Sequence, residues 1–256
     1  MSLDWVLPDW RAPARVRALS TRRSGGISRD RYASLNLATH VGDEAAAVEE
    51  NRRRLRAAAG LPAQPSWLHQ VHGAEVEDLD RPDCASAPIG HDAALIGRDA
   101  ALTRTVGRVC AILTADCVPI LLADDEGSVV AAAHAGWRGL SAGVLAATVR
   151  ALEVASARVH AWIGPCIGAA HYEVGAEVRD ALLAVDRQAA AAFRATRGGK
   201  FHADLALAAR QQLQALGIAR IHGAGECTYA YPDRYFSHRR DGQTGRQATL
   251  IWLQEP

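Results

Sequence analysis

The residues best suited to chemistry in this chain are a cysteine and a histidine that border two short apolar segments. Cys117 comes directly before the apolar run Val118–Leu122, and His134 comes directly after the run Ser128–Ala133. An Asp-Asp-Glu-Gly turn joins the runs, so the sequence predicts two strands paired as a hairpin. Because the start of one strand in a hairpin lies beside the end of its partner, we expect Cys117 and His134 to lie side by side.

A third reactive side chain could come from the segment Pro65–Val76, which holds His69 and His72. At this spacing two side chains share a face of a helix but take opposite faces of a strand. Trp67 and Val71 favour a strand. Only one of the two histidines should therefore face any given site, and the spacing does not decide which one.

One cysteine with two histidines matches the three-ligand layout of catalytic zinc, which keeps a fourth position open. A thiolate and two neutral imidazoles leave a net charge of about +1, so the ion would stay Lewis-acidic. The pattern favours zinc over a redox copper site, because Met1 is the only methionine and the chain has no His-x-His pair. Two interpretations without metal stay open. Cys117 could be a nucleophile with His134 as its base, or a core thiol beside hydrogen-bonding histidines.

Arginine supplies all but one of the 29 basic residues, and Lys200 is the sole lysine. The planar guanidinium group of arginine matches the geometry of phosphate oxygens. Arg22 belongs to a loop around Gly25-Gly26 that could hold an anion, although an ordinary solvated turn fits the same pattern. The segment Tyr235–Leu253 gathers further charged and polar side chains around two glycines, followed by a final strand.

Length and composition indicate one large enzyme domain. The chain has 256 residues, of which 49% are hydrophobic and 22% charged, enough for a substantial core. A formal net charge of +1 argues against a general nucleic-acid or membrane-surface binder. The five cysteines are odd in number and scattered, the N-terminus does not resemble a secretory signal, and no apolar run reaches membrane-spanning length. We therefore expect a reduced, cytoplasmic protein without disulfides.

Periodicity and end signals place the remaining elements. Helices are predicted over Glu44–Ala59, Leu140–Val154, Val174–Leu183 and Leu205–Leu216, with Ala189–Ala192 as helix or loop. Further strands are predicted over Val159–Ile163, Arg220–Ala224 and Ala248–Leu253. Asp43 and Asp204 are the expected N-caps of their helices. The acidic stretch Asp78–Gly90, which contains Cys84, is expected to be a loop.

Several long motifs resemble the bacterial laccase-domain family. They are HQVHGAEV, ADCVPILL, AAHAGWRGL, IGPCIGAAHYEV and FSHRRDGQTGRQATLIWL, with TRRSGGIS and SLNL before them, so the resemblance covers nearly the whole chain. Members of this family are also described as multicopper polyphenol oxidoreductases, purine nucleoside phosphorylases and a peptidoglycan editing factor. The resemblance implies an α/β (α+β) fold, a single-domain layered αββα sandwich with mixed sheets, related to the cysteine hydrolase domain of a cytotoxic necrotizing factor. It also implies that the ligands of zinc, or of copper, are His72, Cys117 and His134, which selects His72 over His69.

The activities that the resemblance implies are phosphorolysis of adenosine, inosine and methylthioadenosine, together with adenosine deamination. The partners would then be a nucleoside and phosphate, bound by a monomer or weak homodimer. Guanidinium geometry suggests phosphate ligands among Arg22, Arg138, Arg239, Arg240 and Arg246. Candidate groups for base or ribose are Asn36, Gln70 and Ser237. Deamination also needs a proton carrier, for which Asp116 and Asp241 are the candidates.

Three other functions stay open at this stage. The editing role described in the family suggests an amidase acting on a peptidoglycan precursor through Cys117 or its metal. Phenol oxidation with copper is a second alternative, which the lack of His-x-His pairs and of any methionine besides Met1 disfavours. A third is a metal-binding module without catalytic activity.

Overall fold

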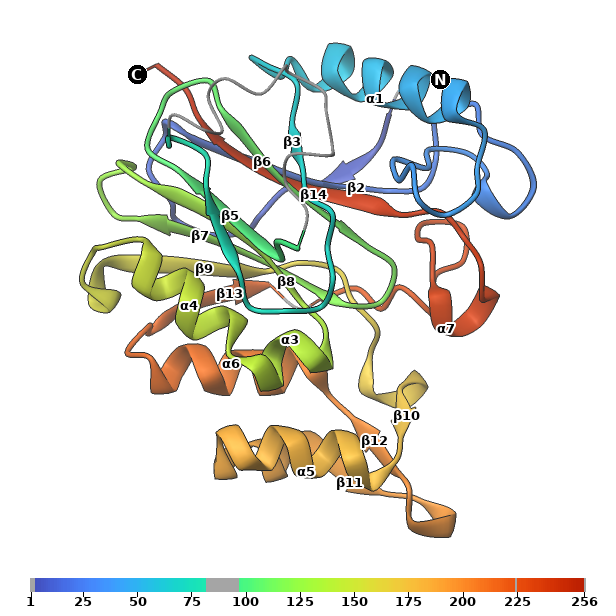
Figure 1. The fold of residues 1–256 in the computed structure, drawn as a ribbon, viewed down its shortest axis with the longest axis vertical. Helices are drawn as coiled ribbons and strands as arrows, with labels where there is room; N and C mark the ends of the chain where they lie inside the picture. The colour runs from blue at the N-terminus through green and yellow to red at the C-terminus, as the bar shows by residue number, and fades with distance from the viewer. Residues whose placement is uncertain (1–2, 82–96, 224, 256) are drawn as a thin grey trace.

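Two β-sheets stacked face to face form the centre of the molecule (Figure 1). The computed structural model describes residues 3–81, 97–223 and 225–255. The first sheet has the strand order β1-β2-β14-β6-β3. Its strands span, in that order, Trp5–Val6, Val16–Thr21, Gln247–Leu253, Val109–Thr114 and Ser66–Trp67. The long strand β14 pairs antiparallel with both β2 and β6, placing Leu250 between Leu19 and Ala111.

The second sheet has the order β13-β9-β7-β8-β5-β4. Its strands span, in that order, Arg220–Gly223, Val159–Ile163, Val118–Asp124, Val130–Ala135, Ala100–Thr103 and Val76–Asp78. The predicted hairpin is confirmed as β7 and β8, which pair antiparallel from Val118 opposite Ala135 to Ala123 opposite Val130. The sequence predicted that His134 follows the second strand. In the structure β8 ends at Ala135, so His134 lies inside the strand.

Helices cover the outer face of each sheet and complete four layers (Figure 1). Helix α1 (Ala45–Ala59) packs on the first sheet, where its Leu55 joins an apolar cluster with Trp67 and Leu250. Helices α3 (Trp137–Ala142), α4 (Val144–Ala151) and α6 (Leu205–Ala215) cover the second sheet. A third cluster, including Ile112, Leu121 and Ile251, fills the space between the sheets. The expected αββα layering with mixed sheets is therefore confirmed.

A smaller unit extends from the α3–α6 side of the molecule (Figure 1). It contains helix α5 (Ala176–Val185) and a sheet of order β10-β12-β11. These strands span Glu173–Val174, Phe201–Ala203 and Phe193–Ala195. The remaining described helices are short: η1 (Asp30–Tyr32), η3 (Ser156–Arg158), η4 (Ala169–His171), η5 (Arg187–Ala192), η6 (Arg197–Gly199) and α7 (His238–Asp241).

The helix predictions need three corrections. Asp43 does not cap α1, because its carboxylate accepts hydrogen bonds from Ser28 and Asn36 while Glu44 stands at the cap. The helix expected over Leu140–Val154 is split into α3 and α4 by Gly143, whose φ of +86° is left-handed. The helix expected from Val174 begins two residues later, because Val174 belongs to β10.

Other helical predictions hold. Asp204 caps α6 by accepting a hydrogen bond from the backbone N–H of Leu207, as expected. The alanine run Ala189–Ala192 lies within the 3-10 helix η5. No helix among the described residues is both long and apolar enough to cross a bilayer.

The strand expected over Pro65–Val76 is wrong for most of its length. Only Ser66–Trp67 at its start is a strand (β3), and Val76 begins β4. Between them the chain forms a loop in which His72 has a left-handed φ of +64°. The alternation rule for strands therefore does not apply to His69 and His72. Cys84 lies outside the described residues.

Candidate metal centre

The β7–β8 hairpin brings Cys117 and His134 together. The register places Pro119 opposite His134, so Cys117, directly before β7, faces Gly136 directly after β8. Glycine is required here because a Cβ atom at position 136 would lie 2.8 Å from Cys117 Sγ. The absent side chain thus leaves room for the sulfur between the ends of the two strands.

His72 completes the group from the loop between β3 and β4. Its ring centroid lies 4.7 Å from that of His134, at an interplanar angle of 71°. One potential ligand atom from each of His72, Cys117 and His134 lies within 4.8 Å of the others. His69 does not join them, and its ring lies 6.4 Å from that of His40. The structure therefore groups the histidine that the family resemblance selects.

The donor set and its electrostatics fit a thiophilic divalent ion. Burial alone would raise the pKa of the Cys117 thiol, but His134 and His72 lower that pKa to about 6. Burial would lower the pKa of His134, but Cys117 and Asp99 raise it to about 9. Without metal the pair is thus a thiolate beside an imidazolium. With the imidazole neutral, the same three groups are the sulfur and nitrogen ligands that zinc prefers.

A buried carboxylate, Asp99, lies beneath this group. It is fully buried directly before β5, and its Oδ1 lies 2.8 Å from Nδ1 of His134. The same carboxylate accepts hydrogen bonds from the backbone N–H groups of Val71, His72 and Gly73. Burial raises the pKa of Asp99, but these contacts hold it below its ordinary value.

The three candidate ligands open onto a cavity of about 370 Å³, within the size range of small-molecule sites. Eight of the residues predicted from the sequence line it: Gln70, His72, Asp116, Cys117, His134, Arg138, Arg239 and Arg246. Burial lowers the pKa of Arg246, although the charges of Cys117 and Asp116 oppose that shift. The guanidinium of Arg239 lies over the ring of Tyr172, with 4.6 Å from its Cζ to the centroid.

Two of the lining residues also have structural contacts. Asp116 has a left-handed φ of +94°, and its carboxylate accepts hydrogen bonds from the Thr228 hydroxyl and the Arg239 backbone N–H. Gln70 pairs with the backbone of Leu113, donating to its carbonyl and accepting from its N–H. The amide of Gln70 therefore already has a partner at both ends.

Five other predicted residues do not line the cavity. Arg22 pairs with Asp4 and with Glu226. Asn36 is fully buried and bonds Ala38, Asp43 and Arg246. Ser237 is the N-cap of α7, where its hydroxyl accepts from the backbone N–H of Arg240.

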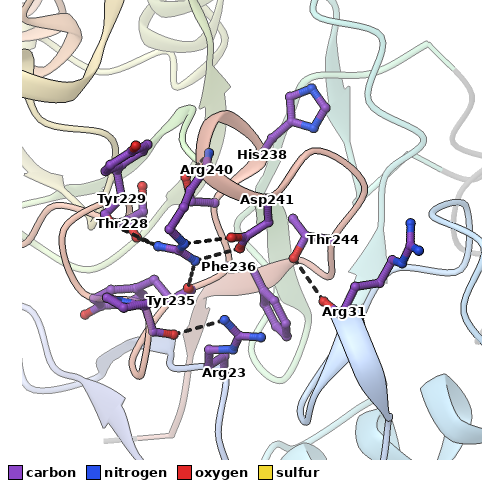
Figure 2. Close-up of polar contacts among 12 residues, drawn as sticks. Arg23, Arg31, Thr228, Tyr229, Tyr235, Phe236, His238, Arg240, Asp241 and Thr244 are labelled. Atoms are coloured by element: carbon purple, nitrogen blue, oxygen red, sulfur yellow. Dashed lines mark hydrogen bonds and ion pairs between the residues drawn. The ribbon is translucent and has the colours of Figure 1, made fainter.

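Arg240 and Asp241, the last two, bind each other (Figure 2). The Arg240 guanidinium also donates to the carbonyls of Thr228, Tyr229 and Tyr235, at 2.9 Å each. The neighbouring arginines 239 and 240 thus have different surroundings: the first lines the cavity and the second joins chain segments beside it.

Several residues at the site escaped prediction. The cavity is also lined by His40, Thr114, Trp137, Tyr172 and His238. The Thr114 hydroxyl is buried and has no hydrogen-bond partner within the part of the chain that the structure describes. Trp137 and Tyr172 belong to the motifs AHAGW and AHYEV, so their position in those motifs was a usable signal. Asp99 gives no such signal, since it lies far from its partners in sequence.

Comparisons of the sequence and of the structure with known proteins point to one family. A model described as multi-copper polyphenol oxidoreductase laccase matches residues 17–254. A purine nucleoside phosphorylase of Pseudomonas aeruginosa is 48% identical over 252 residues, covering 98% of this chain and 99% of that protein. The purine nucleoside phosphorylase YfiH of Escherichia coli is 47% identical over 248 residues, covering 97% of this chain and 98% of that protein. A crystal structure of a Neisseria meningitidis protein has a TM-score of 0.89 at 43% identity, covering 98% and 99% of the two chains.

Proposed function

The chain is an enzyme of the multi-copper polyphenol oxidoreductase laccase family, and on this premise we propose that it is a zinc-dependent purine nucleoside phosphorylase. Its substrates would be adenosine, inosine and methylthioadenosine. A phosphate oxygen forms a bond to the anomeric carbon while the bond to the purine nitrogen breaks. The purine leaves with that electron pair and takes up a proton. The named activity of two relatives, each matching nearly the whole chain, supports this proposal.

The observation that carries the proposal is the set of three arginines around the cavity that holds the candidate metal ligands. Arg138, Arg239 and Arg246 come from α3, from α7 and from the segment before β14. Guanidinium groups bind phosphate oxygens through paired, charge-assisted hydrogen bonds. Among the described residues that line the cavity, Asp116 is the one acidic side chain, and Thr228 and Arg239 already donate to it. The cavity therefore favours an anion.

Zinc is the ion that we propose for the site. His72, Cys117 and His134 would hold it, and three protein ligands leave a fourth position for an exogenous group. When bound, the ion supplies Lewis acidity that stabilises negative charge on a substrate oxygen. Copper is the alternative ion, because copper also accepts thiolate and imidazole ligands.

The remaining wall suits a nucleoside. Trp137 and Tyr172 offer aromatic surface for a purine ring. Burial raises the pKa of Tyr172 to about 12, so its phenol stays protonated as a hydrogen-bond donor. The Thr114 hydroxyl, which lacks a partner among the described residues, would bond to the bound nucleoside or phosphate. Such a bond removes the free-energy cost of an unpaired buried hydroxyl.

Adenosine deamination is the second activity that we propose at this site. Water would replace the exocyclic amino group, which leaves as ammonia. Asp116 is the proposed proton carrier, since it is the acidic side chain on the described wall of the cavity.

A second candidate function is amide hydrolysis of a peptidoglycan precursor, favoured by one arrangement in the site. Cys117 contacts His134, whose other ring nitrogen lies 2.8 Å from Asp99. A nucleophile, a base and an acid that orients the base are the parts of a thiol hydrolase. The products separate the two functions, because the amidase would release an amino acid from a peptidoglycan precursor and the phosphorylase would release a free purine from a nucleoside.

We further propose that the enzyme works in the cytoplasm as a monomer or weak homodimer. The four cysteines that the structure describes, Cys110, Cys117, Cys166 and Cys227, are free thiols. Free thiols suit a reducing compartment.

Product analysis of zinc-quantified protein tests the proposal. Incubation with adenosine should give adenine and ribose 1-phosphate only when phosphate is present, and inosine where deamination occurs. The Cys117→Ala variant should lose both bound zinc and turnover. Cys227→Ala is the matched control, because Cys227 is also half-buried but lies outside the cavity lining.

The outcomes discriminate between the candidate functions. Full phosphorolysis by zinc-free protein would overturn the role of the metal. No product from folded, zinc-loaded protein would overturn the phosphorylase. Release of an amino acid from a peptidoglycan precursor would then establish the amidase.

A further inference from the structure

Asp99 connects two of the candidate metal ligands. The loop that carries His72 and the strand that carries His134 are far apart in the sequence, and both contact the same buried carboxylate. Asp99 also accepts from the residues on either side of His72, and its own backbone carbonyl accepts from the His134 N–H at 2.7 Å. Asp99 itself does not line the cavity.

The hydrogen bonds from the backbone to Asp99 fix the loop that carries His72. Three consecutive backbone N–H groups point at one carboxylate: Val71 and Gly73 donate to Oδ2 at 3.1 and 2.7 Å, and His72 donates to Oδ1 at 2.9 Å. His72 has a left-handed φ of +64°, a conformation that costs free energy in a non-glycine residue. The hydrogen bonds to Asp99 stabilise that conformation and so direct the His72 ring.

The hydrogen bond between Asp99 Oδ1 and Nδ1 of His134 fixes the ring of His134. A carboxylate that receives backbone N–H donors on both oxygens acts as an acceptor, so Nδ1 of His134 is the atom that carries a proton. In the neutral ring the lone pair is then on Nε2. That nitrogen is the one left for a metal ion.

We propose that Asp99 is the positioning residue of the metal centre: it selects Nε2 of His134 as the ligand atom and holds the backbone of His72 in the ligating conformation. This inference rests on the metal-dependent function proposed above. Asp99 does not line the cavity, so it acts through the two histidines.

The substitution Asp99→Asn tests this role because an amide has one acceptor and one donor. With its nitrogen in place of Oδ2, the amide would face the N–H groups of Val71 and Gly73, and two donors would meet a donor. With its nitrogen in place of Oδ1, it would face the His72 N–H and could donate only to an unprotonated Nδ1 of His134. The ring proton would then move to Nε2 and block the ligand atom.

The experiment measures zinc affinity by competition with a chelator, and the His134 tautomer by ¹⁵N NMR. Zinc binding of Asp99→Asn should be about 10- to 100-fold weaker than wild type. Asp124→Asn is the matched control, because Asp124 is also fully buried and accepts backbone N–H bonds, but at the opposite end of the β7–β8 hairpin. It should lower stability and leave zinc affinity unchanged.

Unchanged zinc affinity and tautomer in a folded Asp99→Asn protein would overturn the proposal. If that variant does not fold, ¹⁵N NMR of the zinc-loaded wild type tests the assignment. The proposal requires the His134 proton to be on Nδ1, and a proton on Nε2 would overturn it. Wild-type protein that binds zinc but does not phosphorolyse nucleosides would refute the proposed reaction alone. Wild-type protein with no affinity for zinc would overturn both.

Discussion

The backbone of Gly136 lies directly against the sulfur of Cys117 and leaves no room for a side chain at position 136. A Cβ atom at position 136 would be 2.8 Å from Cys117 Sγ and 3.3 Å from Cδ2 of His72. Real Cβ atoms essentially never approach a heavy atom within 3.0 Å, so one partner would have to move. Gly136 therefore sets the space available to two candidate metal ligands.

The substitution Gly136→Ala should therefore damage the metal centre with little effect on the rest of the fold. We expect zinc affinity to fall roughly 10-fold or more, because the added methyl displaces Cys117 and His72. Overpacking should also cost about 1–3 kcal/mol of unfolding free energy. Chelator competition and thermal melting measure the two effects. Gly225→Ala is the control, since a Cβ there meets open space, and equal zinc affinity in both variants would contradict the prediction.

Thr114→Val should reduce activity without reducing stability. The Thr114 hydroxyl is buried and has no partner among the described residues, so the isosteric valine removes no hydrogen bond from the free protein. We expect an unchanged unfolding free energy, or a gain of up to about 1 kcal/mol. Loss of a bond to the ligand should lower kcat/KM about 10-fold. Thr114→Ser keeps the hydroxyl and should retain most activity; full activity in the valine variant would refute the role of the hydroxyl.

Arg138→Ala should raise the KM for phosphate more than the KM for the nucleoside. Arg138 is exposed at the cavity, its guanidinium lies over the Trp137 ring, and no hydrogen bond or ion pair of that group is found in the described part of the chain. A charge-assisted contact is worth about 1.5–3 kcal/mol, so the KM for phosphate should rise roughly 10- to 100-fold. Initial rates against each substrate give the values. Arg150→Ala, an exposed arginine on α4 outside the cavity, should have no effect.

The centre of the site was predictable because it lies on regular structure. Two short apolar runs and the turn between them predict the β7–β8 hairpin, and hairpin pairing alone brings Cys117 beside His134. His72 could not be chosen by periodicity, because it lies in a loop with a left-handed φ, where neither helix nor strand spacing applies. Its motif resemblance made the choice instead.

Contacts between distant segments were not predictable. Asp99 is a single aspartate whose four partners are set by how the β3–β4 loop folds over β5. The arginines show the same limit: composition identifies Arg239 and Arg240 as phosphate candidates, but only their surroundings separate them. Gly143 likewise divides what the sequence presents as one continuous helical pattern. Its left-handed φ, which causes the division, is seen only in the folded chain.

Arg240→Ala should lower stability, whereas Arg239→Ala should mainly lower activity. Removing the Arg240 side chain leaves the carbonyls of Thr228, Tyr229 and Tyr235 without this donor (Figure 2). We expect a loss on the order of 2–3 kcal/mol in unfolding free energy. Arg239 lines the cavity, and its side chain donates to the single carbonyl of Glu173. Urea unfolding and steady-state kinetics of both variants test the contrast, and equal destabilisation would contradict it.

Asp124 should make the stability of the protein depend on pH under acidic conditions. Its fully buried carboxylate accepts hydrogen bonds from the N–H groups of Ser128 and Val129 and from the Ser128 hydroxyl, closing the turn between β7 and β8. Burial raises the pKa of Asp124, but these bonds hold it below its ordinary value. A folded-state pKa below the unfolded one means that the stabilisation is fully present above the unfolded pKa, about 4, and is lost as the pH falls through the folded pKa.

The variant Asp124→Asn isolates this contribution, because its amide does not titrate. At pH 7 we expect it to be about 1–3 kcal/mol less stable than wild type, since an amide cannot accept all of the bonds that the carboxylate accepts. At pH 3, below the unfolded pKa, the difference should shrink, because the unfolded wild-type chain takes up a proton at Asp124 and the stability of the wild type falls. Urea unfolding of both proteins at the two pH values measures it. A difference that stays constant between pH 7 and pH 3 would show that the charge of Asp124 contributes nothing, and that the turn depends on neutral hydrogen bonds alone.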